Sequence, residues 1–200
     1  MNSLHTPRRP SAGFTLTELL VVIAIIAILG ALAVPSLKSV TAQDRMASEI
    51  NDLNGDIELA RSAAIKQGVT VTICAAATAA DTTATNTASC AGGATGWNAG
   101  WIVFTDVGGA AGVANQTYAI ASGDTLLRIH PALQGGDTVK TTVGSLTFNR
   151  MGGSAFAGNI TLSLHDTNNT AAWLRCLVVS EVGLSVLNTA TQGPNPGTCP

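Results

Sequence analysis

The sequence predicts an α+β protein in which one long N-terminal helix is followed by a β-rich head. Three observations support this prediction. A run of apolar residues follows a short basic segment, a helical pattern of apolar residues continues beyond it to residue 67, and short alternating segments separated by turn residues fill the rest. A chain of 200 residues with a helix at one end leaves room for one modest head domain.

The apolar run covers residues 14–37 and is long enough to cross a membrane. Every residue from Leu19 to Val34 is apolar or Gly, and a helix over residues 14–37 would be about 36 Å long. Arg8 and Arg9 precede the run, with no acidic residue before Glu18. Because basic residues stay on the cytoplasmic side, we expect a single-pass inner-membrane segment with the rest of the chain exported.

Glu18 lies at the start of this apolar run, and two simple interpretations of the run do not explain it. An ordinary signal peptide would suit the basic start and the small residues at 31–33, and a plain membrane anchor would suit the length. Neither accounts for Glu18. A carboxylate near the centre of a bilayer costs about 2.5 to 3.5 kcal/mol, so Glu18 indicates a function with a cationic partner.

The hexapeptide GFTLTE at residues 13–18, followed by the apolar run, resembles the class III leader of type IV pilins and type II secretion pseudopilins. In that family a membrane aspartyl peptidase cuts after the Gly on the cytoplasmic side and then methylates the new N-terminal amine. The resemblance implies that residues 1–13 are a leader, that cleavage falls between Gly13 and Phe14, and that Phe14 is N-methylated by this prepilin peptidase/methyltransferase. Residues 14–37 would then be retained as a filament-core helix.

The charge at the new N-terminus would complement Glu18. Cleavage creates an α-ammonium group on Phe14 that is mostly charged at neutral pH, and methylation to a secondary amine keeps the charge. Glu18 lies one helical turn further on, within reach of its own terminus or that of a neighbouring subunit. A pair between subunits would set the axial register of a filament.

The helix is predicted to continue through residues 38–68 as an amphipathic half. Pro35 removes one backbone donor and is expected to kink the helix without ending it, while Gly68 is a suitable C-terminal stop. Gly55 lowers helix propensity by about 1 kcal/mol, and either close packing or a flexible point would account for it. The stripe that we expect the head to bury consists of Ile50, Leu53, Ile57, Ala60 and Ala64, and the residues outside it include Arg45, Asp52, Asp56 and Lys66.

Residues 69–200 are predicted to form the head. The segment VTVTICA at 69–75 alternates with period two and predicts the first strand, and WNAGWIVFTD at 97–106 is the strongest strand after it. Residues 76–96 between them are rich in Ala, Thr and Gly, without apolar periodicity, which predicts a surface loop. Further strands are predicted at 125–129, 145–149, 158–164 and 173–179, with a hairpin arm at 183–187.

The four cysteines all lie in the part that we expect to be exported. Their even number predicts disulfides in an oxidising periplasm or at the cell surface. Three pairings are possible, and we favour Cys74 with Cys90 and Cys176 with Cys199, because each closes a local loop. Each bridge would contribute about 3 kcal/mol. A zinc site is disfavoured because no CxxC pair is present.

The sequence offers no constellation that argues for catalysis, so we expect neither an enzyme nor a cofactor. Asp106, His130 and His165 lack the spacing of a nucleophile elbow or of metal ligands. Charged residues make up only 11% of the chain and aromatic residues 4%. The tryptophans, which we expect to be core or loop anchors, are Trp97, Trp101 and Trp173.

Four head segments carry a second, narrower resemblance: ARSAAIK at 60–66, VTIC at 71–74, GWIVFTD at 100–106 and LVVS at 177–180. They are similar to the FimT, FimU and GspH group of minor pilins and pseudopilins. The resemblance implies an antiparallel β-sandwich-like head packed on the C-terminal half of the helix. It also implies a low-abundance subunit at or near a filament tip.

The resemblance leaves two functions open. The first is a FimU-like minor pilin that helps to prime type IV pilus assembly, with its head in the periplasm and later at the pilus tip on the cell surface. The alternative is a GspH-like pseudopilin of a type II secretion system. In either case the expected partners are other minor pilins and the major pilin, or the corresponding pseudopilins.

DNA binding, known for some FimT-like members, is a less favoured third function. It uses Arg residues after a C-terminal Gly, whereas Gly183 here is followed by Leu-Ser-Val. The net charge of −2 would become −4 on loss of the leader, since Lys and Arg fall from 10 to 8 against 12 Asp and Glu. Phosphate binding needs clustered cations, so nucleic acid is not an expected partner.

Overall fold

The computed structural model describes residues 13–78, 88–91, 96–107, 116–189 and 199, apart from the side chains of residues 32–36. The chain divides into two compact units, residues 1–41 and 42–200. Residues 1–12 of the predicted leader, and parts of the loop predicted at 76–96, lie outside the described residues. The predicted functional boundaries after residues 13, 37 and 68 stay predictions.

A single helix, α1 (Leu16–Gln67), comprises 52 residues in the first part of the chain. It begins at Leu16, two residues after the expected start, and it continues through Pro35, which therefore does not end it. The kink expected at Pro35 stays a prediction. Gly68 stops the helix as predicted, because its φ of 69° suits glycine and its N–H donates to the Ala64 carbonyl oxygen at 3.0 Å.

The head buries the predicted stripe on residues 42–67 of α1. All five predicted stripe residues are at most 1% exposed, from Ile50 to Ala64, and Met46 extends the stripe by one turn. The prediction that Asp56 lies outside the stripe is wrong, since Asp56 is only 2% exposed. It lies three residues after Leu53 and four before Ala60, on the same side of the helix, and its carboxylate is held by hydrogen bonds from the head.

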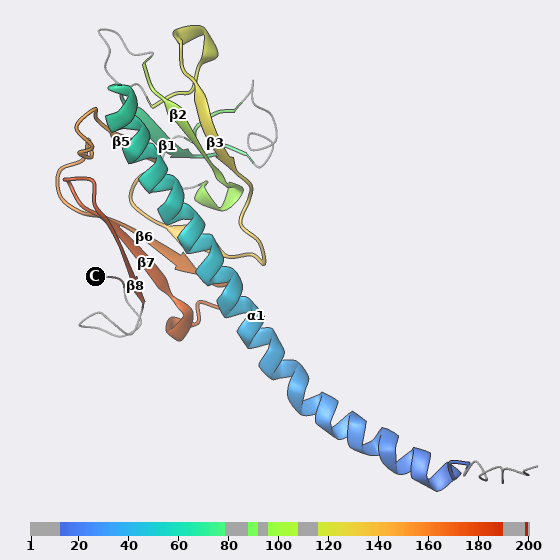
Figure 1. The fold of residues 1–200 in the computed structure, drawn as a ribbon. Coiled ribbons are helices and arrows are strands. Elements are labelled where there is room, and N and C mark those ends of the chain that lie inside the picture. The colour runs from blue at the N-terminus through green and yellow to red at the C-terminus, as the bar shows by residue number, and fades with distance from the viewer. Residues whose placement is uncertain (1–12, 79–87, 92–95, 108–115, 190–198, 200) are drawn as a thin grey trace, which may run out of the picture. The chain divides into compact units, whose positions relative to one another are not determined.

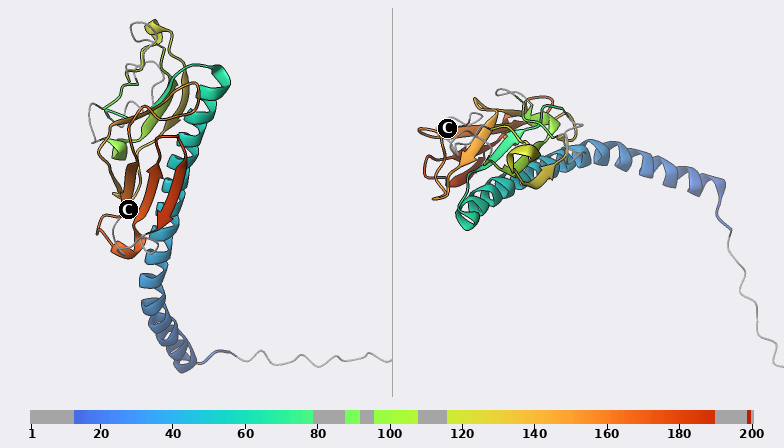
Figure 2. Two further views of the ribbon diagram at one scale, coloured as in Figure 1. Left: turned by 90° about the vertical axis from the view of Figure 1, so that its left-hand side faces the viewer. Right: turned by 90° about the horizontal axis from the view of Figure 1, so that it is seen from above.

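Two four-stranded antiparallel sheets form the head, and both lie alongside α1 (Figures 1 and 2). The first has the order β3-β2-β1-β5 and the second the order β4-β6-β7-β8. The strands are β1 (Val71–Ala75), β2 (Trp101–Thr105), β3 (Leu126–His130), β4 (Thr138–Lys140), β5 (Ser145–Phe148), β6 (Ile160–His165), β7 (Arg175–Val179) and β8 (Ser185–Thr189). The predicted α+β class is confirmed.

The prediction placed the start of two strands too early and missed a third strand. The strand predicted at 97–106 begins only at Trp101, because residues Trp97–Ala99 form a 3₁₀ turn between Gly96 and Gly100, whose φ angles of 116° and 100° interrupt an extended chain. Trp173 belongs to another short 3₁₀ turn, and β7 starts at Arg175. Strand β4 was not predicted, since three residues carry too little alternation to be recognised.

The central strands β1 and β2 are buried on both faces. On one face Trp101, Val103 and Ile73 join the core beneath α1. On the other face Ile102 and Phe104 join a smaller cluster with Ala88. Strands covered on both sides read as continuous apolar runs, which explains why 101–104 is so strongly apolar. Trp97 and Trp101 are fully buried, as predicted for core anchors, whereas Trp173 is only partly buried.

Replacing Gly55 by Ala should raise the free energy of unfolding by about 1 kcal/mol, because Ala restores helix propensity. A Cβ at Gly55 would meet no atom within 4 Å, so close packing does not account for this glycine. Urea unfolding of the detergent-solubilised chain, followed by tryptophan fluorescence, measures the change. An unchanged or lower stability would contradict the expectation. Gly183→Ala is the matched opposite case, since its Cβ would overlap the Gly152 carbonyl oxygen.

Candidate functional site

The predicted processing site lies in open, non-helical backbone just before α1. A Cβ at Gly13 would meet nothing within 4 Å, and Phe14 is 74% exposed. Thr15 forms the N-cap of α1, since its hydroxyl accepts the Glu18 N–H at 3.2 Å. The Gly13–Phe14 bond is therefore accessible in the unprocessed chain, outside the hydrogen bonds of the helix.

Glu18 has a local environment that the sequence analysis missed. Thr15 and Glu18 stand at the N-cap and third positions of α1, the spacing of a capping box. A carboxylate in the first turn also interacts favourably with the positive end of the helix dipole. The signal was the pattern Thr-x-x-Glu before an apolar run. Glu18 therefore suits the start of this helix before any partner is present.

The first turns of α1 expose apolar side chains in every direction. Nothing in the described part of residues 13–31 covers them, and a helix that is apolar all round is normally buried. Among the residues described, no helix contains an apolar stretch long enough to qualify as a candidate membrane span. The large side chains, each between 42% and 79% exposed, are Leu16, Leu19, Leu20, Val21, Val22, Ile23, Ile25, Ile26, Ile28 and Leu29.

Asp56 is the main polar link between α1 and the first sheet. Its Oδ2 accepts the Trp101 Nε1–H at 2.9 Å, and its Oδ1 accepts the Arg128 Nε–H at 2.8 Å. Arg128 stays 59% exposed, so only the carboxylate of this ion pair is buried. The imidazole of His130 stacks on Trp101 with ring centroids 3.8 Å apart. This arrangement satisfies Asp56 and positions α1 on the sheet.

A second polar link joins α1 to the turn before β4. The Arg45 guanidinium donates two hydrogen bonds to Asp137, at 2.9 and 2.8 Å. Glu49 lies beside this pair and is 7% exposed. Its Oε1 accepts the Gln134 N–H at 2.8 Å, and its Oε2 is buried without a hydrogen-bond partner among the described residues. Burial raises the pKa of Glu49 to about 7, and the Asp137 carboxylate raises it as well.

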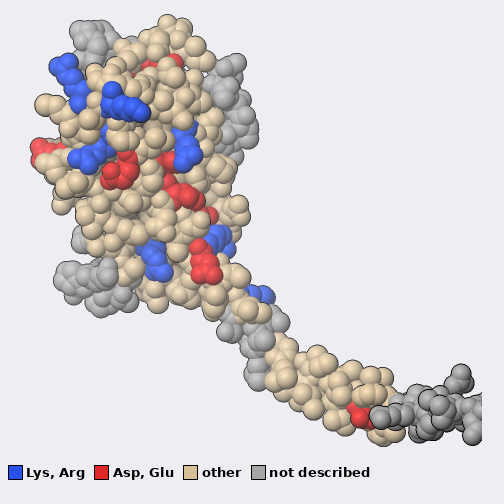
Figure 3. Space-filling model, in the orientation of Figure 1, with Lys and Arg blue, Asp and Glu red and all other residues tan. Residues whose placement is uncertain are grey.

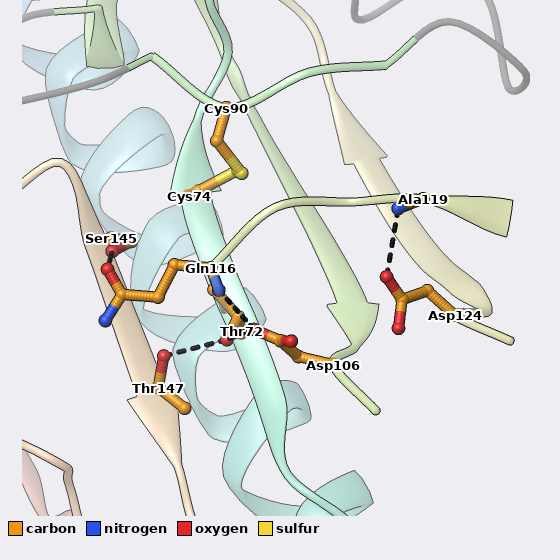
Figure 4. The surroundings of a disulfide bond; sticks show 9 residues. All are labelled: Thr72, Cys74, Cys90, Asp106, Gln116, Ala119, Asp124, Ser145 and Thr147. Carbon is orange, nitrogen blue, oxygen red and sulfur yellow. Dashed lines mark hydrogen bonds between the residues drawn. A yellow bond between two sulfur atoms is a disulfide. The ribbon is translucent and has the colours of Figure 1, made fainter. Parts of the chain in front are cut away.

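The outer face of the first sheet carries the disulfide between Cys74 and Cys90 (Figure 4). Below it Asp106, fully buried at the end of β2, accepts hydrogen bonds from Thr72 Oγ1 and the Gln116 N–H, both at 2.8 Å. The role is that of a strand-end turn, not of a catalytic acid. Asp124 holds the neighbouring segments in the same way, through the N–H groups of Val107 and Ala119.

A cavity of about 490 Å³ adjoins this disulfide, and its size suits a small molecule. Its lining includes Cys90, Gln116, Ser145 and Phe156, and none of the lining residues is charged. Among the residues that the structure describes, the lining therefore offers no acid or base. The second disulfide joins Cys176 to Cys199, so both pairings are those that locality along the chain favours.

The remaining residues considered for catalysis are His130 and His165, and each contacts a polar atom close to it in the sequence. His165 contacts Ser163 Oγ at 3.1 Å, and burial lowers its pKa. His130 Nδ1 donates to the Pro131 carbonyl oxygen at 2.9 Å. In the described part of the chain, no group of three or more His, Cys, Asp or Glu residues could hold a metal ion. Both histidines therefore make local contacts that suit packing.

Comparisons with known proteins agree with this geometry. The family model described as "Type II transport protein GspH" matches residues 49–183, and the "Prokaryotic N-terminal methylation motif" matches residues 8–34. No curated protein matches the chain significantly. Among solved structures, the type IV minor pilin FimU of Pseudomonas aeruginosa is similar in two crystal forms.

The likeness to FimU concerns the fold. One crystal form aligns with a TM-score of 0.54 and 20% identity, covering 79% of this chain and 98% of FimU. The other aligns with a TM-score of 0.51 and 21% identity, covering 76% of this chain and 99% of FimU. The fold of about four fifths of the chain therefore recurs in a protein of low sequence identity.

Proposed function

The chain belongs to the family of the type II transport protein GspH, whose members are minor pilins and pseudopilins, and from that membership we propose that it is a non-catalytic subunit at the tip of a type IV pilus. It would help to prime filament assembly. The N-terminal methylation motif implies processing by a prepilin peptidase, anchoring in the membrane and assembly with other pilins. A pseudopilin of a type II secretion system is the second candidate, which the name of the matching family favours.

One observation carries the proposal: the methylation motif at 8–34 coincides with a helix start whose apolar side chains are exposed all round. Lipid would cover these side chains before assembly, and the helices of neighbouring subunits would cover them in a filament. Phe14, once processed, would present its ammonium group to Glu18 of a neighbouring subunit. Residues 14–37 would thus serve as both membrane anchor and filament core.

The first test is the N-terminus of the mature chain, which should be N-methylated Phe14. Gly13→Val should block cleavage and leave the full-length form in the membrane fraction. Glu18→Ala should permit cleavage but lower incorporation into sheared filaments about tenfold, as the loss of one well-formed ion pair of about 1.4 kcal/mol predicts.

Asp44→Asn is the matched control for Glu18→Ala, since it removes one exposed negative charge from the same helix. It should leave incorporation unchanged. A mature N-terminus after residue 33, or normal incorporation of both the Gly13 and the Glu18 variants, would reject the proposal. Loss of twitching motility in a deletion strain would favour the pilus, and loss of enzyme secretion the secretion system.

A further inference from the structure

Four exposed apolar side chains gather at the C-terminal end of α1. Ile65 on the last turns of α1 is 51% exposed, Met151 is 81%, Val182 is 63% and Leu184 is 53%. They come from three segments far apart in the sequence, and together we call them the α1-end patch. Contiguous exposed apolar surface commonly marks an interaction site, whereas single exposed residues do not.

Two glycine turns bring these segments together beside α1 (Figure 1). A Cβ at Gly183 would lie 1.9 Å from the Gly152 carbonyl oxygen, so the two turns are in direct backbone contact. Arg61 Nε on α1 donates to that same oxygen at 3.0 Å. A Cβ at Gly152 would lie 2.6 Å from Ile65 Cδ1. The patch is therefore built on a close backbone packing that larger residues would prevent.

Positive charge borders the α1-end patch. Lys66 and Arg150 are exposed, directly after Ile65 and directly before Met151. In the part of the chain that the structure describes, neither cation forms an ion pair. Two carboxylates also lie here: Glu58 shares the Ser185 hydroxyl with Asn54, and the exposed Glu181 accepts only a long hydrogen bond, 3.5 Å, from the Gly158 N–H. Figure 3 shows several Lys and Arg, with Asp and Glu beside them, on the part of the head around the end of α1.

An apolar centre that includes a methionine, with Arg and Lys at its edge, has the composition of a protein interface. Its partner must offer apolar side chains bordered by Asp and Glu. DNA fits less well, because two or three cations around an apolar centre would make few phosphate contacts. A second copy meeting patch to patch fits less well too, because the symmetric contact would bring together Lys66 and Arg150 of both copies with only the exposed Glu181 to offset them.

We propose that the α1-end patch binds the head of a neighbouring, different subunit of the assembly, through apolar contacts and through carboxylates that face Lys66 and Arg150. The proposal rests on the proposed function, since it takes the partner from the same filament or secretion complex. The contact surface consists of the two glycine turns and the end of α1. Because it comes from three segments, no single stretch of the sequence predicts it.

The test uses the full-length chain in the producing cells, with a photoreactive amino acid in place of Met151. Irradiation should yield an adduct with one processed pilin or pseudopilin. The same probe at Ile120, which is 53% exposed in another element, is the matched control and should yield none. Arg150→Glu should lower the adduct about tenfold, whereas Lys140→Glu, the same charge change on β4, should not. Reversing a carboxylate of the partner to Lys should restore the adduct with Arg150→Glu.

The chain's presence in sheared filaments or in the secretion complex is scored in parallel. If the unmodified chain is absent from both, the proposed function fails. If it is incorporated but Met151 gives no adduct, or only adducts with nucleic acid, lipid or a second copy, the inference alone fails. An equal loss of adduct with Arg150→Glu and Lys140→Glu would also overturn it. Both substituted side chains are exposed, so the variants should retain their fold and both disulfides.

Discussion

Replacing Asp56 by Ala should lower the free energy of unfolding of the head by about 3 kcal/mol. The change leaves the indole N–H of Trp101 without an acceptor, and Trp101 is fully buried. An unsatisfied buried donor costs about 1 to 3 kcal/mol, and the charge-assisted bond from Arg128 is lost as well. Arg128 itself can return to water, because it is already 59% exposed, and this limits the loss.

Asp52→Ala is the matched control on the same helix. It removes the same charge, but the Asp52 side chain is 56% exposed and lies 3.8 Å from His130 Nε2, so the cost should stay below about 0.5 kcal/mol. Urea unfolding of the detergent-solubilised chain, followed by tryptophan fluorescence, compares the two variants. Equal losses would show that Asp56 acts only through its charge. Asp56→Asn should recover part of the loss, since its amide oxygen can still accept from Trp101.

The second large effect is a pH dependence that Glu49 should impose on head stability. Burial first, and then Asp137, raise its pKa from 4.5 to about 7, although the Gln134 N–H and Arg45 act in the opposite direction. Because the folded pKa lies above the unfolded value, the stabilisation is fully present below pH 4.5 and is lost as the pH rises through 7. The loss should be on the order of 3 kcal/mol.

Glu49→Gln should remove this dependence. The amide is neutral at every pH and can still accept from the Gln134 N–H, so the variant should differ least from the natural chain at pH 5 and exceed its stability most at pH 8. The groups around Glu49 are Arg45, Asp137 and Gln134, with Asp52 and His130 lining the same pocket. Unfolding curves at pH 5, 6, 7 and 8 provide the test. A constant difference between variant and natural chain across that range would contradict it.

Much of the fold could be predicted from local patterns. The stripe from Ile50 to Ala64 depends on one period of side-chain burial, which neighbouring residues reveal, and the strand at 71–75 was indicated by its alternating β-branched residues although both of its faces are buried. Both cysteine pairs close short loops, so proximity along the chain was a fair guide to their pairing. The strand predicted at 97–106 was too long, because hydrophobicity gave no sign of the positive φ angles at Gly96 and Gly100.

Asp56 and Glu49 show where local patterns are insufficient. Both are charged residues on a helix, and an acidic residue is normally placed on the solvated face. Their burial depends on donors that lie far away in the sequence, namely Trp101 and Arg128 for Asp56 and Gln134 for Glu49. The α1-end patch is of the same kind, since Ile65, Met151 and Leu184 meet only through the contact of two glycine turns.

The sequence alone determined the long helix, the β-rich head that follows it and the GFTLTE motif at 13–18, because each depends on the type and spacing of residues that are close together in the chain. Only the tertiary structure decided which polar groups are buried and which apolar groups stay exposed. Burial is a property of the whole packing, since a carboxylate such as Asp56 can leave water only where distant donors replace its hydration.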